Sequence, residues 1–215
     1  MSSPAFERGP PAAPGLRVIA PPPARIGPNA IIQVGRALER AHGRDFSAAV
    51  FGGVALDAYL EVPPSEMVDE REVIALHGAV RRALAPDAAA AVARTAGIAT
   101  GDYLLEHRIP KPAQRLLRLL PRALAARLLL AAIARNAWTF VGSGTLTTRS
   151  GRRPVLVVGD CPICRGVRAS TAACEYYRAT FERLFRALVD ERTTARETLC
   201  AAAGDEQCRF ELEWP

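Results

Sequence analysis

Five cysteines and a glutamate in the last quarter of the chain have the types and spacing of metal ligands. Cys200 and Cys208 flank a predicted hairpin loop, which would bring their backbones close together across the turn. Glu197 precedes Cys200 with two residues between them, a spacing common among metal ligands. Cys174 lies near the start of a predicted helix, after a cap at Ser170 or Thr171, where the helix dipole favours a thiolate. Three thiolates and a carboxylate suit a closed, structural zinc site.

Cys161 and Cys164 form a second motif, Cys161-Pro-Ile-Cys164, directly after a predicted strand. Such a pair is either a redox couple or half of a zinc site, although no thioredoxin-like βαβ pattern surrounds this one. An alternative metal set therefore combines Cys161 and Cys164 with two of the later cysteines. Free cysteine is also among the most buried residue types, so metal-free core cysteines remain a third interpretation.

Motifs for catalysis and for common cofactors are missing from the sequence. Gly142-Ser-Gly144 lacks the third glycine of a dinucleotide-binding loop and lies in a strand-like segment, so no nicotinamide or flavin site is expected. We find no P-loop, nucleophile elbow or H-E-x-x-H motif, and the three histidines are far apart in sequence. The residues thus suggest a binding protein without a catalytic set of its own.

The elements that must position these cysteines follow from hydrophobic periodicity. Helices are expected over residues 28–43, 46–60, 69–84 and 86–107, and a fifth, kinked or split at Pro121, ends near Ala137. Strands are expected over residues 139–148, 154–158, 193–201 and 208–214, with a helix over residues 171–189. The predicted fold class is α+β, a helical N-terminal half followed by a small antiparallel sheet with a packed helix.

Length and composition allow one sizeable domain, because 49% of the 215 residues are hydrophobic. Residues 1–24 contain seven prolines and few large apolar side chains, so they are expected to form a flexible tail. Residues 25–215 are expected to form a single ligand-binding domain.

The net charge of +6 comes almost entirely from arginine, since Lys111 is the single lysine. Arginine favours acidic ligands, whereas the absence of a lysine-rich run disfavours nucleic acid. No secretory signal is visible, which predicts a cytoplasmic protein with reduced thiols. Arginines and Pro121 interrupt the most apolar stretch, so no transmembrane segment is expected. A peripheral contact with a membrane surface through Arg115, Arg118 and Arg122 is an alternative to a solvated helix face.

Two stretches, CEYYRATFERLFRALV from Cys174 and ETLCAAAGDEQCRFELEW from Glu197, resemble the 4-vinyl-reductase domain family. The similarity extends from about Arg25 to Trp214. It implies a mixed fold related to vesicle-tethering subunits and haem-nitric-oxide-associated domains, often dimeric. Related domains carry a structural zinc on a Cys, Glu-x2-Cys-x7-Cys pattern, which Cys174, Glu197, Cys200 and Cys208 match. The zinc-stapled part would then span about residues 160–215.

The resemblance further implies a role in bacteriochlorophyll biosynthesis. The expected activity is that of an accessory or carrier protein that binds a tetrapyrrole, a magnesium porphyrin or protochlorophyllide, and works beside magnesium chelatase and the methyltransferase after it. The alternatives are a divinyl protochlorophyllide 8-vinyl reductase using an external electron donor, and a ligand-sensing or scaffolding module. Trp138, Phe140 and His77 are candidate ligand-binding residues, with plain core packing as the other interpretation, and arginines could pair with propionates.

Overall fold

The computed structural model describes residues 24–215, so the tail predicted for residues 1–24 lies outside the described part except for Ala24. The first helix, α1 (Asn29–His42), begins after Pro28 and buries the apolar stripe Ile31, Val34 and Leu38. It ends at Gly43, whose φ of 86° suits glycine because the residue has no β-carbon.

Short helices complete the N-terminal half. They are α2 (Arg44–Gly52), α3 (Ala58–Glu61), α4 (Glu70–Ala83) and α5 (Pro86–Tyr103), which continues as the π-helical turn η1 (Leu104–Arg108). The single helix predicted over residues 46–60 is wrong, because the chain turns after Gly52 and Ala55 adopts a φ of 57°. Strands β1 (Arg25–Ile26) and β2 (Val68–Asp69) pair antiparallel, and at two residues each they are too short to show an alternating pattern.

Pro121 divides the next helical segment into α6 (Lys111–Leu119) and α7 (Arg122–Arg135), as its missing N–H and fixed φ predict. A 3₁₀ turn, η2 (Ala137–Thr139), follows α7. The strand predicted over residues 139–148 therefore begins only at Thr145.

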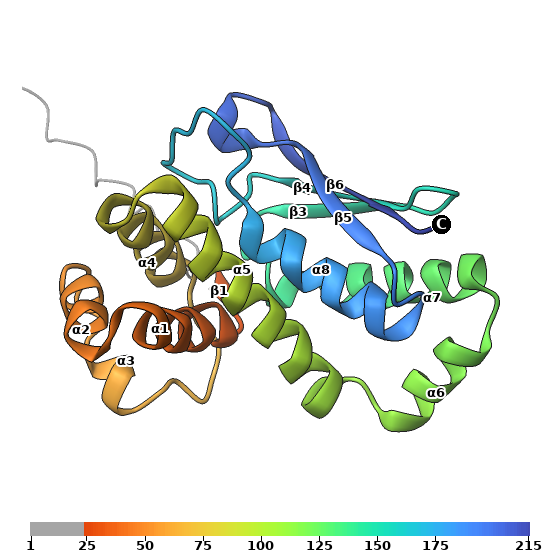
Figure 1. Cartoon of the computed structure of the whole chain (residues 1–215), viewed down its shortest axis with the longest axis horizontal. Coiled ribbons are helices and arrows are strands. Elements are labelled where there is room, and N and C mark those ends of the chain that lie inside the picture. The colour runs from red at the N-terminus through yellow and green to blue at the C-terminus, as the bar shows by residue number, and fades with distance from the viewer. Residues whose placement is uncertain (1–23) are drawn as a thin grey trace, which may run out of the picture.

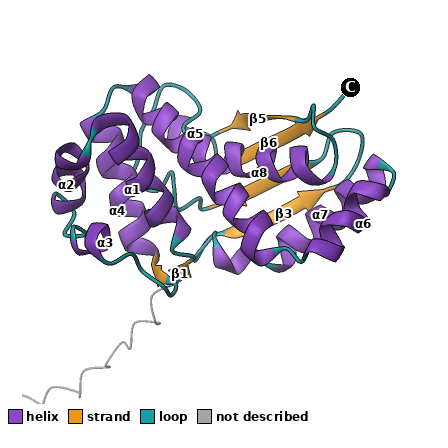
Figure 2. Ribbon diagram, turned by 60° about the horizontal axis from the view of Figure 1, so that its bottom comes forward, coloured by secondary structure: helices purple, strands orange, loops and turns teal. Residues whose placement is uncertain are grey.

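Four antiparallel strands form the C-terminal sheet in the order β3-β4-β6-β5. Their bounds are β3 (Thr145–Arg149), β4 (Val155–Gly159), β5 (Thr194–Leu199) and β6 (Gln207–Glu213), with a 3₁₀ turn, η3 (Ala201–Ala203), between the last two in sequence. Helix α8 (Glu175–Leu188) connects β4 to β5 and lies across one face of the sheet (Figure 2). Cys208, Phe210 and Leu212 of β6 are buried on alternate positions, as a strand with one covered face requires.

Helix α8 joins the two halves because α5 runs against it (Figure 1). The Thr180 hydroxyl donates to the Gly97 carbonyl at 3.0 Å, and the hydroxyls of Tyr176 and Thr100 lie 2.9 Å apart. On its other side α8 packs Phe181 edge-on against Phe210 of the sheet, with ring centroids 5.4 Å apart. A helical half and an antiparallel half thus share one core, which confirms the predicted α+β class.

Ion pairs connect α8 to the neighbouring edge strand. Arg178 donates to Glu182 at 2.8 Å and to the Ala195 carbonyl oxygen at 3.1 Å. Glu182 in turn accepts from the Ala195 N–H at 2.9 Å. In the part of the chain that the structure describes, no helix is both long and apolar enough to cross a bilayer.

Candidate metal centre

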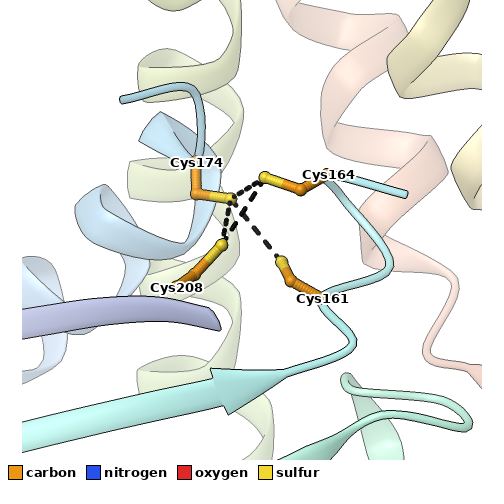
Figure 3. Close-up of side chains that lie close together, drawn as sticks. All are labelled: Cys161, Cys164, Cys174 and Cys208. Atoms are coloured by element: carbon orange, nitrogen blue, oxygen red, sulfur yellow. Dashed lines mark hydrogen bonds between the residues drawn. The ribbon is translucent and has the colours of Figure 1, made fainter. Parts of the chain in front are cut away.

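The five cysteine side chains and Glu197 meet at one end of the sheet, and all five cysteines are buried with free thiols. They come from four places: the loop after β4, the residue before α8, the end of β5 and the start of β6. Figure 3 shows four of the thiols pointing at one another. Five sulfur–sulfur distances describe the group: 2.9 Å for Cys164–Cys174, and 3.6 Å for Cys161–Cys174, Cys164–Cys200, Cys164–Cys208 and Cys174–Cys208.

Both sets of donors predicted from the sequence are brought together. The ligand atoms of Cys174, Glu197, Cys200 and Cys208 all lie within 4.8 Å of one another. The same holds for Cys161, Cys164, Cys174 and Cys208, so the alternative set also exists in space. The two sets share Cys174 and Cys208.

A β-bulge explains how Glu197 and Cys200 reach the same site. In a regular strand, residues three apart point to opposite faces of the sheet. Here Glu197 pairs with Phe210 while Leu199 pairs with Arg209, so the register between β5 and β6 shifts at Thr198. The extra residue reverses the alternation and turns Cys200 to the face that Glu197 occupies.

The start of α8 differs in detail from the prediction. The helix begins at Glu175 with Cys174 at the N-cap position, and no side chain caps it, so the predicted cap at Ser170 or Thr171 is wrong. Instead, the Cys174 N–H donates to Oε2 of Glu197 at 2.8 Å. A carboxylate from β5 therefore occupies the place of a capping group, where the helix dipole favours negative charge.

Several features of the cluster fit a bound cation. Backbone N–H groups point at two of the sulfurs, from Ala173 to Cys200 at 3.3 Å and from Ala201 to Cys208 at 3.4 Å, an arrangement that stabilises thiolates. Oε1 of Glu197 is buried and has no hydrogen-bond partner within residues 24–215. Burial, followed by the thiol of Cys200, raises the pKa of Glu197 to about 9 when no metal is present. A divalent ion would partner the free oxygen and favour the ionised carboxylate.

The thiols titrate as a group because each is a neighbour of several others. Hydrogen bonds from the Cys161 and Cys174 thiols lower the pKa of Cys164. The converse contacts, first with Cys161 and then with Cys164, raise the pKa of Cys174. Full ionisation of the cluster therefore needs a compensating positive charge, which a metal supplies.

Arg81 of α4 holds the Cys161–Cys164 loop next to Cys174. Its guanidinium donates to the Ile163 carbonyl oxygen at 2.8 Å and to the Ala173 carbonyl oxygen at 2.7 Å. One planar cation thus connects the segments that carry Cys164 and Cys174. Sequence reasoning missed this residue, because no local pattern relates α4 to either segment.

A second arginine fixes the loop from the other side. Arg165 donates to Glu70 at 3.0 Å and to the Asp160 carboxylate at 2.9 Å, and Glu70 also accepts from the Ser143 N–H at 2.8 Å. Burial acts to raise the pKa of Glu70, but the hydrogen bonds from Ser143 and the charge of Arg165 hold it below its usual value. The position of Arg165 directly after Cys164 was the available sequence signal.

The three candidate ligand-binding residues have different surroundings. Trp138 is 62% exposed in η2. Phe140 packs edge-on against Tyr177, with centroids 5.8 Å apart, and its carbonyl accepts from the Tyr177 hydroxyl. His77 is buried in α4, and its Nε2 lies 3.1 Å from the Ala30 carbonyl oxygen, so this histidine has a partner within the core. Trp138 is therefore the one of the three with a large exposed surface.

An arginine-rich hollow of about 480 Å³ lies between α6, α7 and the end of α8, away from the cysteines. Arg118, Arg122, Arg186 and Arg192 line it together with Asp190. Arg122 already pairs with Asp190 at 2.8 Å, so part of this positive charge is neutralised. The sequence showed the arginines on one helix face, but it did not show that the end of α8 closes the hollow.

The fold has relatives among solved structures. The Fe(II) unliganded H-NOX protein from K. algicida aligns with a TM-score of 0.55 over 87% of this chain and 96% of that one, at 12% identity. An H-NOX protein from S. oneidensis in the Fe(II)NO ligation state aligns with a TM-score of 0.50 over 87% and 98%, at 8% identity. The fold is therefore of the H-NOX type, as the resemblance predicted.

The family model of the 4-vinyl-reductase domain matches residues 154–214, the segment that contains all six donors. Fold and site together define a protein with a 4-vinyl-reductase domain. Two longer matches carry the name bacteriochlorophyll synthase 23 kDa chain. The protein from Cereibacter sphaeroides is 44% identical over 87% of this chain and 90% of its own length. The protein from Rhodobacter capsulatus is 42% identical over 87% and 86%. The chain belongs to the family of these bacteriochlorophyll synthase 23 kDa chains.

Proposed function

We propose that this protein is an accessory protein of bacteriochlorophyll biosynthesis that binds a tetrapyrrole and is stabilised by structural zinc. The main support is the 44% identity over 87% of the chain with a bacteriochlorophyll synthase 23 kDa chain. The pathway handles magnesium porphyrins and protochlorophyllide, so these are the ligands to test. Residues 25–215 would act as one ligand-binding domain.

The zinc proposal rests on the donors and their surroundings. Cys174, Glu197, Cys200 and Cys208 form a complete four-ligand set, which leaves no open coordination position and favours a structural role. When bound, zinc would supply the positive charge that the buried donors require. Its binding energy would stabilise the fold of about residues 160–215, because the ligands come from separate elements.

The tetrapyrrole proposal rests on the family and on exposed surface near α7. Trp138 presents an aromatic face to solvent, and Leu124 and Leu128 of α7 are also exposed. Such groups can stack on a macrocycle, with arginines available for its propionates. Several H-NOX structures of this fold are described for haem distortion or for haem redox potential, so tetrapyrroles are a ligand class of these fold relatives. Phe140 and His77 would support the ligand-binding region from within the core.

The two tryptophans offer a matched test. Magnesium protoporphyrin is titrated into the zinc-loaded protein while tryptophan emission is recorded. We expect quenching that saturates at micromolar pigment. Trp138→Phe should remove most of the quenching amplitude, whereas Trp214→Phe should retain it, because Trp214 is partly buried against the core. Absence of binding at tens of micromolar pigment would contradict the carrier proposal.

The same preparation distinguishes a carrier from a vinyl reductase. The protein is incubated with divinyl protochlorophyllide and either reduced nicotinamide or reduced ferredoxin. For a carrier we expect the pigment to be recovered unchanged. Monovinyl product formed over many turnovers would establish the alternative activity instead.

Partners and location complete the proposal. A carrier would exchange pigment with magnesium chelatase and the following methyltransferase, in the cytoplasm or at the membrane surface, and a homodimer is expected from the resemblance. Pull-down with and without pigment tests the enzyme contacts, and light scattering tests the dimer. Capture of a partner by pigment-free protein alone would favour a scaffolding or sensing module.

A further inference from the structure

We propose that the cluster holds two divalent metal ions, with the thiolates of Cys174 and Cys208 bridging between them. Cys161 and Cys164 would complete the first ion's ligands, and Glu197 and Cys200 the second's. The inference deepens the proposed zinc role and rests on it. It gives the Cys161-Pro-Ile-Cys164 motif a function that a single-zinc site does not.

The geometry supports bridging because the two four-donor groups overlap in Cys174 and Cys208. Within each group the ligand atoms lie within 4.8 Å of one another. Two sulfurs on one tetrahedral zinc are about 3.8 Å apart, since each Zn–S bond is about 2.3 Å. The sulfurs of Cys174 and Cys208 lie 3.6 Å apart, which suits a shared edge between two tetrahedra. In Figure 3 the other two thiols approach this pair from the loop after β4.

A single ion leaves buried donors without a use. If it takes Cys174, Glu197, Cys200 and Cys208, the thiols of Cys161 and Cys164 stay in the core at 2% and 4% exposure. If it instead takes Cys164 with Cys174, Cys200 and Cys208, the buried Oε1 of Glu197 keeps no partner within residues 24–215. An unpartnered buried carboxylate oxygen is costly. Two ions use all six donors.

Charge leads to the same conclusion. Six ionised donors around one divalent cation would leave a formal charge of about −4 in the interior, whereas two cations leave about −2. The Arg81 guanidinium, bound to the carbonyls of Ile163 and Ala173, adds positive charge beside the donors of the first ion. The backbone N–H groups directed at Cys200 and Cys208 favour their thiolate forms on the second ion's side.

The test counts metal ions on the full chain. Metal-free protein is reconstituted with zinc against a chromophoric chelator, and bound zinc is measured by elemental analysis. We expect two zinc ions per chain in the wild type and one in the Cys161→Ser/Cys164→Ser double variant. A wild-type value of one would overturn the inference, whereas no binding at all would also remove the structural-zinc proposal.

Cobalt(II) supplies a readout on the wild-type chain that does not depend on a variant folding. Two cobalt ions joined by thiolates couple magnetically, so the second equivalent should reduce the paramagnetic resonance signal produced by the first. Independent, additive signals would contradict bridging. Acid-labile sulfide with iron in the isolated protein would identify an iron–sulfur cluster and would equally overturn the assignment of two zinc ions.

Discussion

Gly97 of α5 lies so close to Tyr176 of α8 that a β-carbon on Gly97 would come within 2.3 Å of the Tyr176 carbonyl oxygen. The backbone of α8 must move if this position gains a side chain, because the clash is with main chain and not with a flexible group. Cys174 lies immediately before α8, so the α5–α8 contact also positions one of the metal donors.

Gly97→Ala should therefore lower the free energy of unfolding by about 3 kcal/mol, as overpacking of a tight helix contact does. Gly52→Ala is the matched control, because a β-carbon there meets nothing within 4 Å. Thermal and denaturant unfolding followed by circular dichroism measure both. Equal stability of the two variants would show that the helices do not pack this closely.

His77 should make stability depend on pH in a defined direction. Burial, and then the charge of Arg81, lower the pKa of His77 to about 3, so the native state excludes a proton that the unfolded chain binds below about pH 6.5. The stabilisation from neutral His77 is present above pH 6.5 and is lost as the pH falls towards 3. At about pH 5 the loss is about 2 kcal/mol.

His77→Gln retains a donor for the Ala30 carbonyl oxygen but cannot titrate. Its unfolding free energy should fall less between pH 7.5 and pH 5 than that of the wild type, while His42→Gln should follow the wild type. The carboxylates and thiols titrate in all three proteins, so the comparison isolates His77. Parallel pH profiles for His77→Gln and wild type would contradict a buried neutral imidazole.

Arg81→Lys should weaken metal binding without removing any donor. Lysine cannot donate from one planar group to the carbonyls of both Ile163 and Ala173, so the loop that carries Cys164 should loosen. Outer contacts of this kind are worth about 10- to 100-fold in metal affinity. Zinc transfer to a chelator should be faster by a similar factor, and Arg82→Lys, one residue along α4, should leave the rate unchanged.

Cys208→Ser should give protein that is metal-free or insoluble, because Cys208 belongs to both sets of donors. Loss of the metal removes energy that holds β5, β6 and the start of α8 together. Elemental analysis and the soluble yield measure the effect, with Thr198→Ser on the neighbouring strand as the control. Full zinc occupancy in Cys208→Ser would show that this thiol is not a ligand.

Local patterns predicted much of the fold. Helix α1 follows from its apolar stripe between Pro28 and Gly43, and the break between α6 and α7 follows from Pro121. The break after Gly52 was missed because the apolar pattern continues through it to Leu60. The late start of β3 was missed because threonine and valine after Trp138 imitate a strand.

The donor set was predictable by residue type and spacing, but its geometry was not. Hairpin reasoning correctly placed Cys200 near Cys208, since the strands that carry them are neighbours in sequence and in the sheet. The bulge at Thr198, which aims Glu197 and Cys200 at one face, depends on pairing with β6. The role of Arg81 depends on how α4 packs, and no sequence period encodes that contact.

The ladder from Arg178 through Glu182 to Ala195 has a consequence for motion. It fastens α8 to β5 along the middle of the helix, while the donors fasten its first residue to β5 and β6. Helix and sheet should therefore respond to a pigment as one rigid block. Any rearrangement would be confined to α1–α4 and α6, where amide hydrogen exchange should change on binding while that of β5 and α8 stays slow.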